Sequence, residues 1–330
     1  MPKLPSSLSA RLRQNSELVA AYAVVLQAER NLEETGKGDS SISNERLIYC
    51  RILGCLLEYA PGDRSRGLVA SEISGCGREQ GKLLELGKWY YDHFERILQA
   101  GAALQNLRNR DPYADCPADA NLPPPATQEE STKGPLLGSH KLAHRMAKRR
   151  DDRHCQLTGG PDIHSLVKYK WIEEKWLREE QDRNPVPAQG YHILHQITAP
   201  EDGDDYSKTA WALIERLGFR SILDELRGTG VHRLENMMTM SPFANRFFNS
   251  LNIWLSPVDN EPNAYYIKHD IEHYEVLDLK LQKKVVFSTK KPGEWHLPSP
   301  KYLEIHAACA RVAHFSGAGD YINDRILAME

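Results

Sequence analysis

The sequence predicts an α+β fold, with a helical region in the first third of the chain and a mixed region after it. Three observations support this prediction. Apolar residues recur at helical spacing over the first hundred residues, a proline-rich segment follows, and alternating apolar runs occur only after that segment. With 330 residues and 41% hydrophobic content, the chain is long enough for one large domain or two ordinary ones.

The helical region is expected over residues 1–110. Apolar residues follow the period of an α-helix in Leu18–Leu26 and Leu47–Tyr59, and a third helix is expected over Glu79–Leu107. Glycine and proline residues separate these segments. We interpret the helices as core and scaffold.

Residues 111–138 differ in composition from their surroundings. They contain six prolines among Asp, Glu, Ser and Thr, with few large apolar residues. Such a stretch buries too little apolar surface to offset the entropy of ordering it. We therefore expect a linker or mobile loop here, which separates the helical region from a second region at residues 139–330.

The second region combines expected strands with an expected helix near its end. Leu251–Leu255 alternates as a half-buried strand does, and Ala264–Ile271 and Lys284–Ser288 are also expected to be strands. Ser299-Pro300 predicts a helix start, with a side-chain cap and a proline in the first turn. Ser316-Gly317 predicts the end of that helix.

Three motifs in this region hold residues able to carry chemistry. Cys155–Gly160 is a short extended run closed by a glycine turn, and Tyr191–Ile197 has the pattern of a strand. Alternation along that strand would place His192 and Leu194 on one face and His195 on the other.

The third motif is a strand that runs directly into a helix. Met237–Met240 is the expected strand, and Ser241-Pro242 is a typical helix start. Asn245 then falls in the first helical turn, and Asn249 lies one turn later on the same face. A histidine-bearing strand, a second strand and a helix whose first turn faces the histidine would form a compact ββα unit.

The order of these motifs resembles the HNH-nuclease-like domain common in fungal proteins. The matching features are Cys155-x-Leu157-Thr158-Gly159, the strand histidine, the run Glu235–Pro242 and a helix with an Arg-aromatic-aromatic sequence. The resemblance extends roughly from residue 150 to the C-terminus.

The resemblance implies roles for individual residues. His192 matches the general base that activates water against a phosphodiester, and histidine suits this role because its pKa lies near neutral pH. Asn236 matches the asparagine that orients the base or the adjoining loop. A divalent metal ion would stabilise the departing oxygen, with ligands from the residue before the base and from the first turn of the helix.

The expected metal ligands are where this sequence departs from the family. Tyr191 precedes the base in place of Asp or His, Asn245 replaces the helix histidine, and Asn249 replaces an acidic residue. Two amide oxygens would hold Mg²⁺ or Mn²⁺ weakly and would hardly bind zinc. We expect Asn245 and Asn249 to be the ligands, with a carboxylate supplied from elsewhere. The candidates for that carboxylate are Asp224, Glu225 and Glu235.

A basic cluster lies immediately before the ββα unit. Residues 141–154 contain six Lys or Arg against two Asp, a formal surplus of four. Such a cluster can bind a phosphate backbone, and the alternative is a solvated face at a domain boundary. The residues predicted to bind substrate in this way are Lys148, Arg149, Arg150 and Arg153.

Composition excludes several classes of protein. The net charge of −3 argues against a polycation that coats nucleic acid. The six cysteines form no CxxC pair, so a zinc ribbon or a disulfide framework is not expected. No signal peptide, membrane span or organic-cofactor motif is found, which predicts an intracellular protein of the cytoplasm or nucleus.

These observations leave three functions open. The first is a divergent HNH-type endonuclease that hydrolyses phosphodiesters with His192 as base. The second is an HNH-like fold reused as a tailoring enzyme for a small molecule, with cyclase or proton-transfer chemistry in a fungal biosynthetic pathway. The third is a non-catalytic binding protein that retains only the fold.

Overall fold

The computed structural model describes residues 3–35, 40–77, 79–108, 140–194, 212–271 and 279–327. The predicted linker at 111–138 and His195 lie outside these residues. The described chain is an α+β protein, as predicted, in which many helices accompany two small antiparallel sheets.

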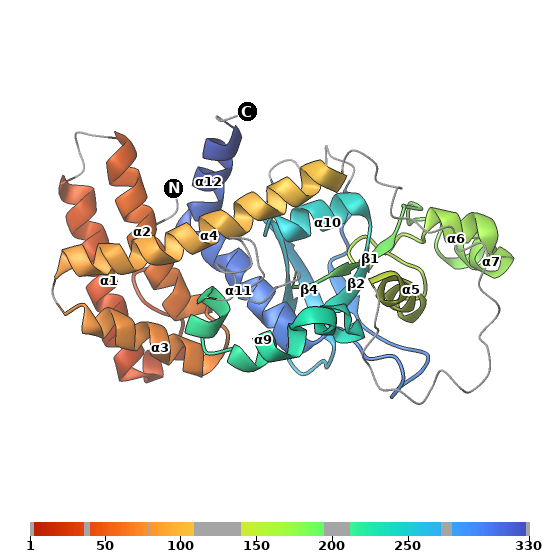
Figure 1. Cartoon of the computed structure of the whole chain (residues 1–330), viewed down its shortest axis with the longest axis horizontal. Helices are drawn as coiled ribbons and strands as arrows, with labels where there is room; N and C mark the ends of the chain where they lie inside the picture. Colours follow the sequence, from red (N-terminus) through yellow and green to blue (C-terminus); the bar gives the residue numbers. More distant parts are fainter. Residues whose placement is uncertain are drawn as a thin grey trace.

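Six helices form the larger helical part of the molecule, which extends from one end of the view in Figure 1 to its middle. They are α1 (Ser16–Thr35), α2 (Ser40–Tyr59), α3 (Gly62–Gly75), α4 (Gln80–Arg108), α11 (Pro300–Ser316) and α12 (Ala318–Leu327). The buried side chains of α1–α4 form one apolar cluster with Ala310 of α11 and Ile322 of α12. Residues 139–330 were expected to form a second region, whereas buried side chains of α11 and α12 join the apolar cluster of α1–α4.

The remaining α-helices are shorter. They are α5 (His140–Arg150), α6 (Ile163–Lys168), α7 (Lys170–Glu179), α9 (Arg220–Leu226) and α10 (Pro242–Asn249). The 3-10 turns η4 (Gly228–His232) and η5 (Leu234–Asn236) precede β2, whereas Leu12 of η1 (Leu12–Gln14) belongs to the apolar cluster of α1–α4. Figure 1 shows α5, α6 and α7 at the end of the molecule opposite to α1–α3.

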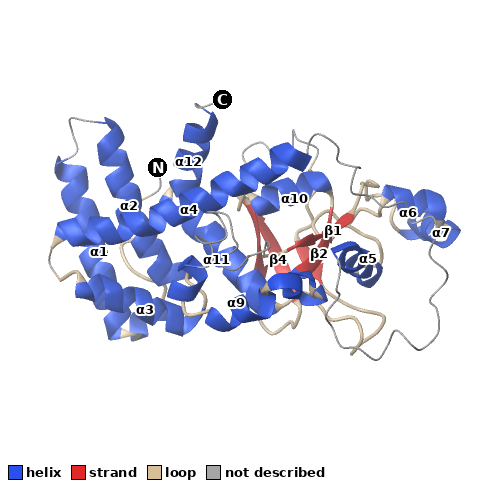
Figure 2. Ribbon diagram, in the orientation of Figure 1, coloured by secondary structure: helices blue, strands red, loops and turns tan. Residues whose placement is uncertain are grey.

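Two antiparallel sheets occupy the middle of the molecule (Figure 2). One is the antiparallel pair β1 (Gln189–His192) and β2 (Met237–Met240), and the other has the order β3 (Ile253–Pro257), β4 (Ala264–His269) and β5 (Lys284–Val286). A second apolar cluster packs around the three-stranded sheet and includes Phe248 of α10 and Leu303 of α11. Helix α11 therefore contributes to both cores.

The three strands predicted after residue 250 are present with different bounds. Leu251 has a positive φ of 62° and lies in the turn after α10, so the strand begins at Ile253. The predicted start of α11 at Ser299 is also correct, but the Ser299 side chain makes no cap hydrogen bond. Gly317 ends the helix in the left-handed conformation, with φ 75°.

Within the ranges that the structure describes, no helix combines the length and the apolar character that a membrane span requires.

Helix α5 packs directly on the pair β1–β2, and a glycine permits this close approach. A Cβ at Gly190 would lie 2.9 Å from Cα of His144 and 3.1 Å from Cβ of Ala147. The small side chains of Ala143 and Ala147 form an apolar cluster with Met237 of β2. The contact between α5 and the strands thus depends on small residues on both sides.

We predict that Gly190→Ala destabilises the protein by about 1–3 kcal/mol, because the added methyl group forces α5 away from the strands. Gly81→Ala in α4 is the matched control, since a Cβ there meets nothing within 4 Å. The control should be neutral or stabilising by up to about 1 kcal/mol. Urea denaturation of both variants measures the difference, and equal free energies of unfolding would contradict the prediction.

Candidate functional site

The site predicted from the sequence is built on β1, β2 and α10. In the antiparallel pair, Gln189 lies opposite Met240 and His192 lies opposite Met237. The chain then enters α10, where the Ser241 hydroxyl accepts a hydrogen bond from the backbone N–H of Ala244 at 3.1 Å. Because Ser241 is followed by proline, the helix begins immediately after the strand.

His192 lies on the face of the strand pair that α5 covers. It is opposite Met237, which packs against Ala143 and Ala147 of α5. Opposed residues in an antiparallel pair point to the same face, so His192 points to the α5 side. The ring of His144 on α5 lies 6.4 Å from the ring of His192, edge to face.

Tyr191 alternates with His192 along β1, and its ring centre lies 6.3 Å from that of His144 on α5. It lies opposite Met238, and both belong to the apolar cluster that includes Ala244 and Phe248 of α10. Strand alternation separates the side chains of His192 and Tyr191. The expectation that the first turn of α10 faces His192 stays a prediction.

A second histidine, which sequence analysis did not identify, contacts His192. Nε2 of His192 lies 3.1 Å from Nδ1 of His232 in η4, and the two ring centres are 5.2 Å apart. His192 is only 8% exposed. Burial lowers the pKa of His232 below its ordinary value, which favours the neutral ring. No motif singles out His232, because its partner lies forty residues earlier in the chain.

Asn236 connects the segments that carry the two histidines. Its amide oxygen accepts from the N–H of Leu194 at 2.9 Å, and its Nδ2 donates to the carbonyl of Leu194 at 2.8 Å. The same Nδ2 donates to the carbonyl of Val231 at 3.0 Å. The side chain is fully buried, so these bonds are shielded from water. Asn236 thus holds both the residues after His192 and the turn that ends at His232.

The two predicted metal ligands on α10 carry unpartnered amide oxygens. Asn245 is only 5% exposed, and Asn249 follows one helical turn later. Neither Oδ1 has a hydrogen-bond partner within the described part of the chain, although both atoms are buried. A buried polar atom without a partner is costly, and a bound cation would satisfy it.

The chemistry of the two amide oxygens limits which metal ions they could bind. Amide oxygens suit a hard cation such as Mg²⁺ or Mn²⁺. Across the described ranges, no group of three or more His, Cys, Asp or Glu side chains is placed to bind a metal ion. Amide oxygens are not the nitrogen and sulfur ligands that a zinc site requires.

Arg150 was predicted to bind substrate, but the structure uses it to join four segments. Its five donors bond to both carboxylate oxygens of Asp151 and to the backbone carbonyls of Leu234, Met237 and His296, at 2.7–3.1 Å. Arg150 is 3% exposed. With every donor occupied inside the protein, this residue has none for a phosphate.

Two other predicted substrate-binding residues are also engaged internally. Lys148 pairs with the buried Asp162 at 2.8 Å. Arg153 donates to Ser165 at 3.2 Å and lies 4.4 Å from the centre of the Tyr169 ring. Of the four predicted residues, Arg149 is the exposed one.

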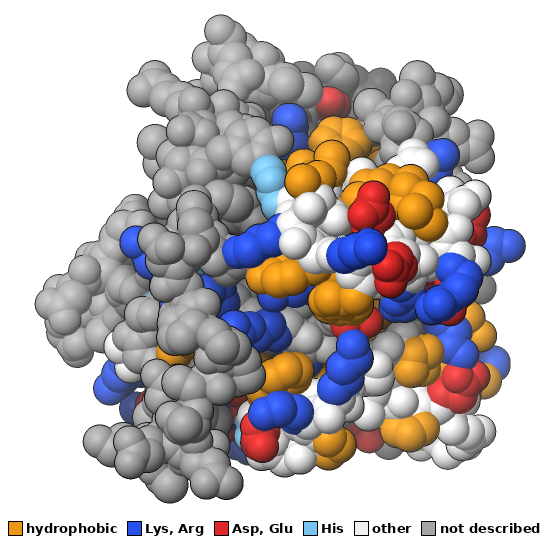
Figure 3. Space-filling view, turned by 90° about the vertical axis from the view of Figure 1, so that its right-hand side faces the viewer, with side chains coloured by type: hydrophobic (Ala, Val, Ile, Leu, Met, Phe, Trp, Pro, Cys, Tyr) orange, Lys and Arg blue, Asp and Glu red, His pale blue; other side chains and the backbone are white. Residues whose placement is uncertain are grey.

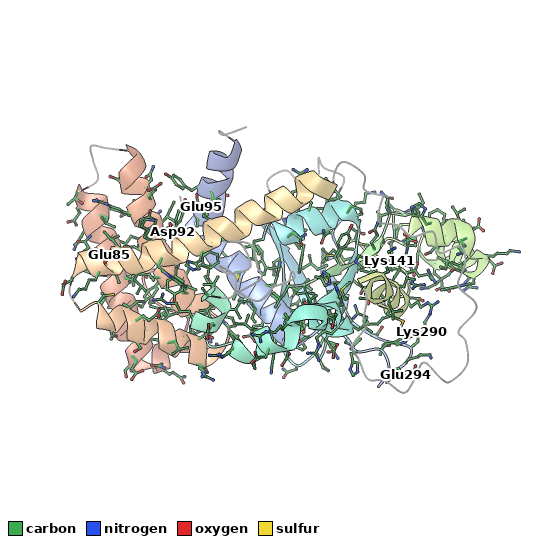
Figure 4. All side chains as sticks on the ribbon, viewed as in Figure 1. Glu85, Asp92, Glu95, Lys141, Lys290 and Glu294 are labelled. Atoms are coloured by element: carbon green, nitrogen blue, oxygen red, sulfur yellow. The ribbon has the colours of Figure 1, made fainter. Side chains whose placement is uncertain are left out.

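The surface around α5 carries mixed charge. Figure 3 shows Lys and Arg side chains spread over this end of the molecule, with apolar and acidic side chains between them. Figure 4 shows Lys141 at α5, with Lys290 and Glu294 on the loop before α11. Lys290 contacts Asp152 and Glu294 pairs with Lys291, so part of this charge is neutralised locally.

Comparison with known proteins adds no identification. No family model, no curated protein and no solved structure matches the chain.

We predict that Arg150→Met lowers the free energy of unfolding by about 3–5 kcal/mol, because it leaves the buried Asp151 carboxylate without its partner. Arg149→Met removes the same charge from the neighbouring exposed position and should change stability by less than about 0.5 kcal/mol. Chemical denaturation followed by circular dichroism measures both. A small effect at Arg150 would show that the buried ion pair is not needed for the fold.

Proposed function

We propose that this chain is a divergent, metal-dependent phosphodiester hydrolase of the HNH type, with His192 as the general base. The observation that supports the proposal is the unit of β1, β2 and α10 in which Asn236 holds the segment that follows His192. A strand histidine, an asparagine that holds the adjoining loop and a helix that starts directly after the second strand are the parts that the HNH resemblance requires.

In this proposal the residues of the chain divide the work. His192 removes a proton from the attacking water, and Asn236 keeps the backbone on both sides of the site in place. Asn245 and Asn249 would hold Mg²⁺ or Mn²⁺ through their amide oxygens. Such an ion stabilises the negative charge that develops on the leaving oxygen.

Nucleic acid is the substrate class that we propose. The exposed cations Lys141 and Arg149 lie on α5, the helix that covers the His192 face. Three of the other cations in the cluster are paired internally, so contact with the phosphate backbone would be limited. Weak binding with little sequence preference follows from such an arrangement.

We predict that His192→Ala abolishes the nicking of supercoiled plasmid in Mg²⁺ or Mn²⁺, because no other group then takes the proton from water. The loss should be about a hundredfold or more. His164→Ala, which removes an exposed histidine of α6, should retain full activity. Agarose-gel assays with both variants test this. Cleavage that persists in the His192 variant would exclude the proposed base.

We predict that Asn245→Asp lowers the Mn²⁺ concentration needed for half-maximal nicking by about tenfold, because a carboxylate binds a hard cation more strongly than an amide does. Asn245→Ala should raise that concentration. Asn260→Asp adds the same charge in an exposed turn and should leave the metal requirement unchanged. Metal titrations of the nicking rate compare the three variants. An unchanged metal requirement in both Asn245 variants would contradict the metal site.

A second candidate function is acid–base catalysis on a small organic molecule. What favours it is the surroundings of His192, which is nearly buried beside His232 and His144, while the nearby Arg150 is occupied inside the protein. A nearly buried histidine whose basic neighbour is engaged inside the protein suits a small organic substrate better than a polyanion. If plasmid remains intact with Mg²⁺ and with Mn²⁺, this function takes precedence. If, in addition, His192→Ala changes no binding or activity that can be measured, the chain is a binding protein that retains only the fold.

A further inference from the structure

We propose that a polar pocket beside the motif at residues 155–160 binds the phosphate group of a small hydroxylated molecule, through Arg183 and Lys280. Binding at this pocket goes beyond the proposed nuclease activity and does not depend on it. Three features support the site: the segments of chain that are fixed around the pocket, the charged groups that line it, and its size.

The pocket lies between three segments that are far apart in the sequence. Its volume is about 300 Å³, which matches the smaller ligand pockets of proteins. Six of its eight lining side chains are polar or charged, and the other two are apolar. The lining residues are Thr158 of the motif, Asp182, Arg183, Asn184 and Val186 after α7, and Lys280, Leu281 and Gln282 before β5. Such a space suits a small polar molecule.

A tight turn in the motif fixes one wall of the pocket. The N–H of Gly159 donates to the carbonyl of Cys155 at 2.8 Å, and Gly159 has a positive φ of 73°. A Cβ at this glycine would lie 2.7 Å from Cδ of Gln282, so the glutamine rests directly on the turn. The N–H of Gln282 also donates to the carbonyl of Leu157 at 2.8 Å. The turn and residues 280–282 are thereby held together.

A second glycine of the motif fixes the opposite wall. A Cβ at Gly160 would overlap the carbonyl oxygen of Asn184, so the segment after α7 can approach the motif only because this residue is glycine. The N–H of Val186 donates to the carbonyl of Pro161 at 2.9 Å, and the N–H of Ile163 donates to the carbonyl of Val186 at 3.0 Å. The pocket is therefore built on backbone hydrogen bonds, and the motif has a role in it.

The pocket contains two cations whose charge the protein leaves largely available. Lys280 is exposed, and within the described ranges no hydrogen bond or ion pair engages its ammonium group. Arg183 has one ion contact, in which Nη1 lies 3.7 Å from Oε1 of Glu180. That carboxylate has closer partners in His154 at 2.8 Å and Lys175 at 3.0 Å. Most donors of the Arg183 guanidinium thus remain for a ligand.

The charges of the pocket favour a phosphate monoester. Two cations from different segments match its charge of about −1.5 to −2 better than they match a carboxylate or a phosphodiester, which carries one negative charge. A guanidinium presents paired donors to phosphate oxygens, and an ammonium group adds a point charge. Asp182 and Asn184 line the same space, and their side-chain oxygens can accept from hydroxyl groups. A phosphorylated sugar combines both features.

Isothermal titration calorimetry of the full chain tests the proposal with glucose 6-phosphate, inorganic phosphate and glucose. We expect glucose 6-phosphate to bind about threefold or more tightly than inorganic phosphate, and glucose alone not to bind. The double variant Arg183→Met/Lys280→Met should weaken the binding of glucose 6-phosphate by about tenfold or more, because it removes both charged donors. Lys283→Met is the matched control. It removes an exposed lysine that does not line the pocket, and it should leave binding unchanged.

Lys280→Met alone guards against a loss of binding that is caused by misfolding. Its side chain is exposed and engages no partner within the described ranges, so this variant should fold normally and still weaken binding by about threefold or more. Thermal unfolding compares its stability with that of Lys283→Met. Equal affinities in Lys280→Met, in the double variant and in the unmodified protein would overturn the proposal.

The ligands separate the remaining alternatives. If neither glucose 6-phosphate nor inorganic phosphate binds, the phosphate site is overturned. If glucose 6-phosphate binds no more tightly than inorganic phosphate, the assignment of a hydroxylated ligand is overturned. If a DNA duplex without terminal phosphates displaces glucose 6-phosphate, the pocket is a contact for the nucleic-acid backbone and the small-molecule assignment is overturned. Because calorimetry requires no catalysis, these outcomes are independent of the plasmid assays that test the proposed nuclease.

Discussion

The ion pair between Arg150 and Asp151 determines how the candidate site is assembled. Its two charges are almost completely buried, and such charges persist only when hydrogen bonds satisfy all of their polar atoms. Arg150 meets this requirement through carbonyls of η5, β2 and the loop before α11, and Asp151 accepts the N–H of Thr239 at 2.8 Å. Segments far apart in the sequence are thereby brought to the end of α5. The position of α5 over β1 follows, and with it the surroundings of His192.

The same ion pair explains why the basic cluster in the sequence was a poor guide to the cations that are exposed on the surface. A run of basic residues beside a predicted nuclease motif favours phosphate binding, yet a cation can also serve as a multiple donor to backbone carbonyls. Arg150 does so here, and Lys148 neutralises the buried Asp162. These uses depend on carbonyls and carboxylates that only the folded chain brings near, so the pattern of charges along the sequence does not reveal them.

Local signals made some of the elements predictable, whereas α3, α5, α6 and α9 were not predicted. The period of apolar residues indicates α1, α2 and α4, and Ser241-Pro242 indicates the start of α10, because these features depend on neighbours within a few residues. The position of α5, the contact of His232 with His192 and the packing of α11 and α12 against α2 and α4 were not predictable. Each arises between segments far apart in the chain, and a single sequence shows no such pairing. Strand alternation predicted that His192 and Tyr191 point to opposite faces, but it did not predict which helix covers each face.

Helix α10, which carries Asn245 and Asn249, is also packed against α11 of the helical core. The ring of His306 in α11 stacks on Phe248 of α10 at 3.7 Å, and its Nε2 lies 2.9 Å from the carbonyl of Phe248. Since α11 contributes to both cores, α10 is tied to the larger helical part of the molecule. Asn245 and Asn249 therefore stand on a helix with tertiary support, which preorganisation of the proposed cation ligands would require. His192 is held separately, because Asn236 bonds to Leu194 and to Val231 on either side of the contact between His192 and His232.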